Sequence, residues 1–321
     1  MIKKEPIRFI PYLKSVIWGG GKICRYKGIV QTEAKIGESW EISAVAGHET
    51  VVAEGPYKGM KITELIDCFG PELLGSSVME RYDGKFPLLV KFIDANDNLS
   101  VQVHPDDALA GKRHDSLGKT ELWYIIDADE GAKIYSGLNR EMTPEEYVER
   151  VKDDSIEEVL AVHDSHPGDV FFLPAGRVHA IGAGNLLAEI QESSDITYRI
   201  YDYGRKDANG KPRELHTDLA KDAIDYTYRN DYKSANAEES VADAVLAECD
   251  HFTVHRILLD GELTLEHNDK SFTVLMCIEG NASVGYEGGS MSFKAGETLL
   301  LPAALDYVTL RGKATLLTAK A

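Results

Sequence analysis

The chain has 321 residues, of which 43% are hydrophobic, and 53 acidic against 35 basic side chains give it a formal net charge of −18 at pH 7. That length and apolar content predict a globular protein with a sizeable core. The acidic balance argues against nucleic acid and anionic membranes as partners, because no basic excess is present to release counterions. An anionic substrate would need individual lysines and arginines at its site.

Signals for membrane insertion, secretion and disulfide bonding are not found in the sequence. No apolar run reaches roughly 18 residues and the N-terminus has no apolar signal core, so we expect a cytoplasmic protein with no membrane partner. The four cysteines are scattered and form no C-x-x-C pair, which indicates buried reduced thiols.

The first part of the chain is predicted to form mainly strands. Short apolar runs alternate with glycines, and residues 37–43 read as one of these strands. Short helices are expected at 61–69 and 71–79. The strand expected at 87–95 is apolar except for Lys91, which is either a snorkelling edge residue or a functional group. The strand with Lys91 is close in sequence to the strand expected at 99–103, which carries polar residues, and this favours a functional role for Lys91.

A short strand over residues 99–103 ends beside a histidine. Alternation with a period of two sets three apolar residues on one face and Ser100, Gln102 and His104 on the other. Pro105 cannot donate to a strand ladder, so the strand should stop where His104 projects. A strand end of this kind can point a ligand into a cleft from a rigid backbone.

The next segments are a strand and a helix. The strand expected at 119–127 carries Glu121 on the same face as the aromatic residue two positions later, and this carboxylate is either a solvated strand end or a ligand. The clearest helix runs from Thr143 to Ala161, in a helical insertion at about 143–162, because Thr143 can cap it and an apolar stripe follows.

Strands dominate the second half. Alternation in residues 186–193 sets Glu189 and Gln191 on one face, and a strand over 197–205 ends at a turn and carries two arginines. Residues 206–247 are polar and read as a partly helical connection. From about residue 250 the pattern predicts almost only strands.

An internal repeat links the two halves. Residues 167–175 match residues 295–303 in residue type at a constant offset of 128. Two copies of one β unit are therefore expected. At this offset His179 falls on Tyr307, so the second copy should lack a metal.

Short strands, proline–glycine turns and the duplicated unit together predict the fold class. We expect an all-β dominated fold of two cupin barrels, of the double-stranded β-helix or jelly-roll type, with a small helical insertion. Residues 1–240 should form a catalytic metal-binding cupin domain. Residues 241–321 should form a degenerate cupin domain without metal.

Two histidines and one glutamate at predicted strand ends suggest a metal site. They are His104, Glu121 and His179, with Gln102 on the face of His104. Zinc binds such ligands in catalytic sites and keeps one position open, but the same set describes non-haem iron oxygenases. A fourth protein ligand favours zinc. A metal-binding cupin that binds a sugar without catalysis is a further alternative.

Several short segments carry a more specific signature. They are residues 37–41, 89–92, 102–106, 119–121, 174–182 and 191–199. Together they resemble the zinc site, the second histidine motif and the catalytic-arginine motif of the type I mannose-6-phosphate isomerases, which are cupins. The likeness runs nearly end to end, and the length resembles the short bacterial form, since the chain has no room for the helical domain of the long forms.

The resemblance implies a site around one zinc ion per chain. Its ligands by position would be Gln102, His104, Glu121 and His179. The groups it places around the substrate are Arg199 and Lys91 as catalytic residues and Arg205, Lys119 and Ser39 as substrate or phosphate contacts.

The implied reaction interconverts mannose 6-phosphate and fructose 6-phosphate through a cis-enediol. Zinc would act as a Lewis acid and Arg199 would stabilise developing negative charge. The sequence does not assign the base: a water on the metal, His104, Lys91 and Asp202 all remain open. The expected partner is a small sugar phosphate, and the chain is expected to be a monomer or homodimer.

Overall fold

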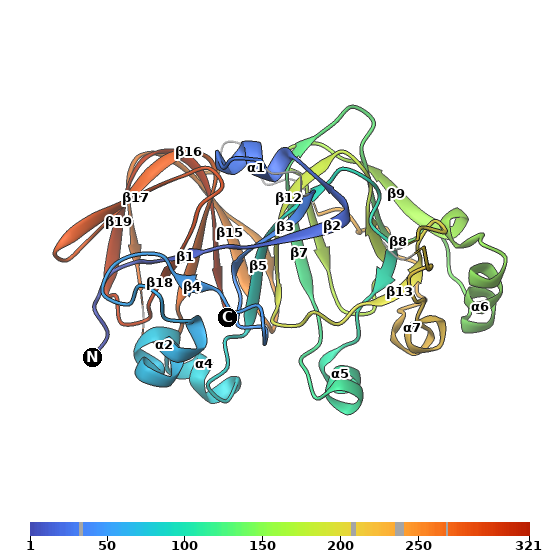
Figure 1. The fold of residues 1–321 in the computed structure, drawn as a ribbon, viewed down its shortest axis with the longest axis horizontal. Coiled ribbons are helices and arrows are strands. Elements are labelled where there is room, and N and C mark those ends of the chain that lie inside the picture. Colours follow the sequence, from blue (N-terminus) through green and yellow to red (C-terminus); the bar gives the residue numbers. More distant parts are fainter. Residues whose placement is uncertain (32–34, 207–209, 235–240, 268) are drawn as a thin grey trace.

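The computed structural model describes residues 1–31, 35–206, 210–234, 241–267 and 269–321. Within these ranges nineteen strands form three sheets. Figure 1 shows two β-rich halves side by side, with the C-terminal strands in orange and red and the middle of the chain in green and yellow. The expectation of a β-dominated fold is confirmed.

Two of the sheets face each other and position the candidate ligands. The six-stranded sheet has the order β10 (Val170–Leu173), β7 (Glu121–Ala128), β12 (Asn185–Glu192), β5 (Leu88–Ala95), β3 (Ile36–Ile42) and β2 (Tyr12–Gly20). The five-stranded sheet has the order β13 (Tyr198–Tyr201), β6 (Val101–Val103), β11 (His179–Ile181), β8 (Lys133–Leu138) and β9 (Leu160–Asp164). One apolar cluster joins them, with Trp123 and Leu187 from the first sheet and Ile134 and Ile181 from the second.

The third sheet has eight strands and contains the C-terminal segment. Its main path is β14 (Asp243–Glu248), β15 (Thr253–Glu266), β19 (Tyr307–Lys320), β16 (Thr273–Tyr286), β18 (Thr298–Leu301), β1 (Ile7–Ile10) and β4 (Val51–Val52), and β17 (Gly289–Lys294) pairs with β16. A second apolar cluster packs it on the opposite face of the six-stranded sheet, through Val90, Phe92 and Ile190 on one side and Val274 and Leu317 on the other.

The eight-stranded sheet includes strands from both ends of the chain. β1 pairs with β18, where Ile7 lies opposite Leu300, and also with β4. Strand pairing therefore crosses residue 240, and the division into domains at that residue remains a prediction. The hydrogen-bonded paths of the three sheets are open, so the closed pair of barrels also remains a prediction.

The helices are short. They are α1 (Lys22–Lys27), α2 (Ile62–Phe69), α3 (Pro71–Leu74), α4 (Ser76–Arg81), α5 (Asp107–His114), α6 (Pro144–Lys152) and α7 (Thr217–Ala223), with a 3₁₀ turn over Ile156–Val159. In Figure 1, α2 and α4 lie at the C-terminal half, and α6 and α7 lie at the far end of the other half. No helix among the described residues combines the length and apolarity needed to cross a bilayer.

Most predicted elements are present, and the insertion differs in its second half. The strands predicted at 37–43, 87–95, 99–103 and 119–127 are β3, β5, β6 and β7. Thr143 caps α6 by accepting from the Glu146 backbone N–H at 3.2 Å, as expected. The helix ends at Lys152 instead of Ala161.

The early end of α6 has a local cause. Asp154 has a φ of 58°, which is left-handed and stops an α-helix, and residues 160–164 pair with β8 as β9. The predicted connection over 206–247 contains α7 in its middle. Its residues 207–209 and 235–240 lie outside the described ranges.

The two copies of the internal repeat have matching local structure. The four-residue strands β10 and β18 lie at the same offset of 128, and each follows a glycine with positive φ, 89° at Gly168 and 82° at Gly296. β10 is at the edge of its sheet, whereas β18 lies between two strands. His179 begins β11 and Tyr307 begins β19. The histidine is 1% exposed and the tyrosine is 57% exposed. The second copy therefore has an exposed phenol at the position where the first copy has a buried imidazole.

Candidate functional site

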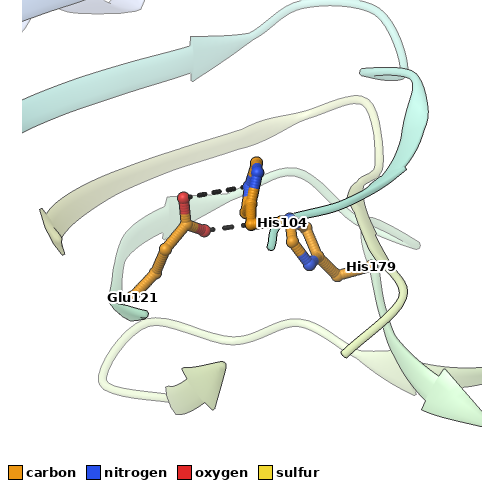
Figure 2. Close-up of side chains that lie close together, drawn as sticks. All are labelled: His104, Glu121 and His179. Carbon is orange, nitrogen blue, oxygen red and sulfur yellow. Dashed lines mark ion pairs between the residues drawn. The ribbon is translucent and has the colours of Figure 1, made fainter. Parts of the chain in front are cut away.

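Three buried side chains from separate strands meet at one end of the core between the facing sheets (Figure 2). His104 directly follows β6, Glu121 begins β7 and His179 begins β11. His104 Nε2 lies 3.3 Å from Glu121 Oε1, and His179 Nε2 lies 3.8 Å from Glu121 Oε2. The structure thus brings together the two histidines and the carboxylate that the sequence singled out.

Backbone carbonyls fix the protonation of both imidazoles. The Nδ1 of His104 lies 2.8 Å from the Ile196 carbonyl oxygen, and the Nδ1 of His179 lies 2.8 Å from that of Arg177. A carbonyl only accepts, so Nδ1 carries the proton in each ring and Nε2 offers its lone pair toward Glu121. This second contact is the usual way in which a protein orients a metal-ligating histidine.

Three acceptor atoms of the cluster have no hydrogen-bond donor in the described part of the chain. Among the described residues, His104 Nε2 and both Glu121 oxygens accept no hydrogen bond, although they are buried. Lys119 Nζ lies 2.9 Å from Glu121 Oε1 as an ion pair without hydrogen-bonding geometry. Buried orphan acceptors of this kind are costly, and a cation among them would satisfy all three.

The charge states also fit a metal. Burial, helped by Lys119, lowers the pKa of His104 to about 4, and burial lowers the pKa of His179. Burial alone would raise the pKa of Glu121, but Lys119 and the histidines hold it well below its ordinary value. Two neutral imidazoles and one carboxylate are a donor set for zinc or for iron(II).

Gln102 extends the cluster. Its Nε2 lies 3.2 Å from His179 Nε2, and turning the amide over would present its oxygen at the same place. In the five-stranded sheet Gln102 lies opposite His179 on one side and Arg199 on the other. Val101 and Val103 pack on the outer face as predicted. Leu99, which precedes β6, was predicted on that same face but instead packs in the inner cluster with Trp123.

A cavity of about 370 Å³ adjoins the cluster. Its charged lining residues are Lys14, Lys91, Lys119, Arg199 and Arg213 against Glu38, Glu189 and Asp195. Five cations against three carboxylates make the lining net positive in a chain whose formal charge is −18. This local excess is the feature that an anionic ligand requires.

Lys91 is held as an ammonium ion. Its Nζ lies 2.9 Å from Glu189 Oε1 and 2.7 Å from Gln191 Oε1, and 5.1 Å from the centre of the Trp40 ring. Burial alone would lower the pKa of Lys91, but Glu189 and then Glu38 raise it above its ordinary value. Lys91 is therefore a fixed charge at the cavity wall.

Arg199 is the cavity cation without a carboxylate partner among the described residues. One Nη donates to the Glu214 carbonyl at 2.9 Å, and the backbone N–H of Arg199 donates to His216 Nδ1 at 3.0 Å. Its buried Nε has no hydrogen-bond partner in the described part of the chain. An uncompensated guanidinium at a cavity wall can bind negative charge that develops or arrives there.

Two residues that the resemblance placed around the substrate do not line the cavity. Ser39 is buried and donates to Glu41 Oε1 at 2.6 Å, on the face of β3 turned away from Trp40. Arg205 donates to Asp202 Oδ1 at 2.6 Å and to the Asn98 carbonyl. Their assignment as substrate contacts stays a prediction from the resemblance.

Five charged lining residues were not assigned from the sequence. They are Lys14, Glu38, Glu189, Asp195 and Arg213. Alternation with Gln191 was a signal for Glu189, and both now hold Lys91. Asp195 and Arg213 lie in irregular segments, where no periodic pattern marks a face.

Comparison with known proteins agrees with this geometry. Residues 7–131 match the family model for the type I phosphomannose isomerase catalytic domain, and residues 243–320 match that for the mannose-6-phosphate isomerase cupin domain. The mannose-6-phosphate isomerase ManA of Bacillus subtilis is 38% identical, with 97% of each chain covered. The mannose-6-phosphate isomerase of Streptococcus mutans is 36% identical, covering 93% of this chain and 92% of the relative. A crystal structure of the Bacillus subtilis mannose 6-phosphate isomerase superposes with a TM-score of 0.88 at 35% identity, over 98% of this chain and 99% of the other.

Proposed function

The chain belongs to the type I mannose-6-phosphate isomerases, and from that premise we propose that it interconverts mannose 6-phosphate and fructose 6-phosphate with zinc at the His104, Glu121 and His179 cluster. It is an isomerase of this family. The observation that carries the proposal is the pair of histidines whose Nε2 atoms are both freed toward one buried carboxylate, beside a net positive cavity. A cytoplasmic location and a monomeric or dimeric state remain predictions.

The reaction moves one hydrogen between neighbouring carbons. A proton leaves C2 of the open-chain aldose, a cis-enediol forms, and a proton is returned to C1, while a hydroxyl proton passes from O2 to O1. Zinc held by His104, Glu121 and His179, with Gln102 as fourth protein ligand, would supply Lewis acidity toward the sugar oxygens. Side chains of the cavity would bind the sugar, stabilise the remaining negative charge and transfer the proton.

Arg199 and Lys91 would supply fixed positive charge. Arg199 has no carboxylate partner among the described residues, so its charge is available to the oxygens of the enediol. Lys91 is kept protonated by Glu189, which fits it to orient the sugar and disfavours it as the base. Lys119 balances Glu121 and lines the same cavity.

Asp195 is the carboxylate available to carry the proton. Asp202 is engaged by Arg205 and Arg213, which lower its pKa against the effect of burial. Glu189 is bound by Lys91 and by the Trp123 indole N–H at 2.9 Å. Asp195 lines the cavity, and its carboxylate has no hydrogen bond or ion pair within the described residues.

We expect Asp195→Asn to lower kcat by about 100- to 10,000-fold, the usual contribution of a general base. Zinc content and the KM for mannose 6-phosphate should change little, because the side chain is neither a ligand nor the sole binding group. The discriminating measurement is kcat determined beside zinc content and KM on the same preparation. A variant with unchanged kcat would assign the proton transfer to another group.

The function is tested by a coupled assay on the purified protein. With mannose 6-phosphate, fructose 6-phosphate should form in proportion to bound zinc measured by elemental analysis. Oxygen uptake with iron bound and no isomerisation would instead indicate a cupin oxygenase. Sugar binding with neither reaction would indicate a non-catalytic cupin.

A further inference from the structure

Arg205 and Arg213 meet at one carboxylate, that of Asp202, beside the cavity. Tyr203 and Gly204 have φ angles of 57° and 64°, which turn the chain after β13. Lys206 and Pro212 then form an isolated antiparallel bridge. The chain has therefore reversed by residue 213, and Arg205 and Arg213 both reach Asp202.

The two arginines differ in the contacts made by the guanidinium nitrogens that do not bind the Asp202 carboxylate. Arg205 gives its other contacts to the Asn98 carbonyl and the Asp97 carboxylate, and it stacks on the Tyr203 ring at 5.1 Å. Arg213 is held by Asp202 through Nε at 2.7 Å and through Nη2. Its Nη1 has no partner within the described ranges. Arg213 lines the cavity, and Arg205 does not.

Asp202 therefore orients Arg213 by binding two of its guanidinium nitrogens. Its carboxylate is 5% exposed and takes both Nε and Nη2, which fixes the plane of the guanidinium. A guanidinium oriented in this way loses little conformational freedom when it binds a second anion. The remaining donor edge is what a phosphate group needs.

The other cavity cations are already committed. Lys14 lies 3.6 Å from Glu38, Lys91 pairs with Glu189, and Lys119 pairs with Glu121. Arg199 has no carboxylate partner among the described residues, and Arg213 keeps its Nη1 available although Asp202 holds the rest of its guanidinium. After burial, Arg213 most lowers the pKa of Arg199. Two guanidiniums that repel each other across a cavity wall are stabilised by a dianion placed between them.

The order of residues across the sheet matches the length of the substrate. His179, Gln102 and Arg199 lie side by side on β11, β6 and β13, and neighbouring strands are about 5 Å apart. The metal cluster is at one end of this row. At the other end, Glu214 and His216 hydrogen-bond to Arg199 on β13, so Arg213, which directly precedes them, lies next to Arg199 on the side away from Gln102. C1 and C2 of an open-chain hexose 6-phosphate can then lie at the cluster with the phosphate at the arginines.

We propose that Arg213 binds the phosphate group of the substrate, next to Arg199, and that Asp202 is its positioning residue. The proposal rests on the proposed function for the identity of the substrate. It replaces Arg205, which the sequence resemblance assigned to the phosphate, with the arginine that faces the cavity.

The kinetic test compares substrates with and without the phosphate. In Arg213→Ala, the KM for mannose 6-phosphate and the inhibition constant of inorganic phosphate should rise by about 10- to 100-fold, as expected for losing a charge-assisted contact. kcat/KM for unphosphorylated mannose should change by less than about threefold. Arg213→Lys should restore part of the loss, and Asp202→Asn should show the same substrate-specific effect in weaker form.

Arg205→Ala is the matched variant, since it removes the other arginine from the same carboxylate. It should affect both substrates in parallel. A phosphate-specific loss in Arg205→Ala without one in Arg213→Ala would overturn the proposal. An equal loss for both substrates in Arg213→Ala would do the same, because it would indicate a structural role.

A binding measurement separates this proposal from the isomerase function. Titration of inorganic phosphate into the unmodified protein and into Arg213→Ala, followed by calorimetry, needs no turnover. Binding that is lost in Arg213→Ala and kept in Arg205→Ala supports the phosphate site even if no isomerisation is found. Equal binding by the unmodified protein and Arg213→Ala contradicts it even if isomerisation is confirmed.

Discussion

Replacing Glu121 with glutamine is expected to remove bound zinc and lower kcat/KM by about 1,000-fold or more, since a catalytic metal contributes several kcal/mol to transition-state stabilisation. The substitution keeps the shape of the side chain and removes its charge. Lys119 is then left 2.9 Å from an amide instead of a carboxylate, and the Nε2 atoms of His104 and His179 lose the anion they face. Elemental analysis and the coupled assay measure both losses.

Glu41→Gln is the control for this experiment. Glu41 is also a buried glutamate of the facing sheets, but its partners are Lys27 and Ser39 on the opposite face of β3. This variant should keep its zinc. If Glu121→Gln retained full metal content and activity, the cluster would not be the metal site. Chelation of the unmodified protein should abolish activity, and added zinc should restore it.

Arg199→Ala should lower kcat by about 100- to 1,000-fold, the range found when one donor to a developing oxyanion is removed. The reason is that Arg199 is the lining cation without a carboxylate partner in the described part of the chain. No hydrogen bond or ion pair joins its guanidinium to Gln102, His104, Glu121 or His179, so zinc should stay near one per chain. Arg199→Lys should recover part of the rate, because charge is kept and the planar donor geometry is lost.

Metal content and thermal stability decide how that result is interpreted. Normal zinc and normal unfolding with slow turnover identify Arg199 as catalytic. Loss of zinc would show that Arg199 has a structural role. Gln102 lies between Arg199 and His179 in the sheet, so Arg199 would then help to hold the ligands in place. Unchanged turnover would indicate that Lys91 and the metal stabilise the negative charge of the enediol without Arg199.

Local sequence patterns were sufficient for the strands and for the positions of the ligands. Alternation marks β6, Pro105 ends it, and His104 follows, while Glu121 and His179 stand at the first positions of β7 and β11. These signals depend only on neighbours in sequence. The meeting of three strand ends in space depends on topology, which the residue pattern alone left open and the resemblance supplied.

Elements that begin or end through distant contacts could not be predicted. α1 starts where Asp94 on β5 accepts from the backbone N–H groups of Lys22 and Ile23, at 2.6 and 3.3 Å. Gly21, the residue before the helix, has no side chain to cap it, so the local sequence has no start signal. The cap is 72 residues away in sequence, and a region expected to hold only strands and turns contains a helix.

The position of the two arginines relative to the cavity could not be predicted either. Arg205 lies six residues after Arg199, and the resemblance assigned it to the phosphate. The turn at Tyr203 and Gly204 takes it away from the cavity, and Arg213 returns to the wall. A positive φ at a tyrosine is rare enough that no sequence rule anticipates it.

The pairing of β1 with β18 determines when the protein can finish folding. Ile7 lies opposite Leu300, so β1 must wait for a partner that is synthesised 293 residues later. Until then its hydrogen-bonding edge is unpaired and open to wrong partners. A nascent chain stalled at residue 240 could form the sheets that carry the candidate ligands, but the eight-stranded sheet would still lack its central strands. The eight-stranded sheet can therefore be completed only after residue 300 has been synthesised, even though β4 is available to β1 much earlier.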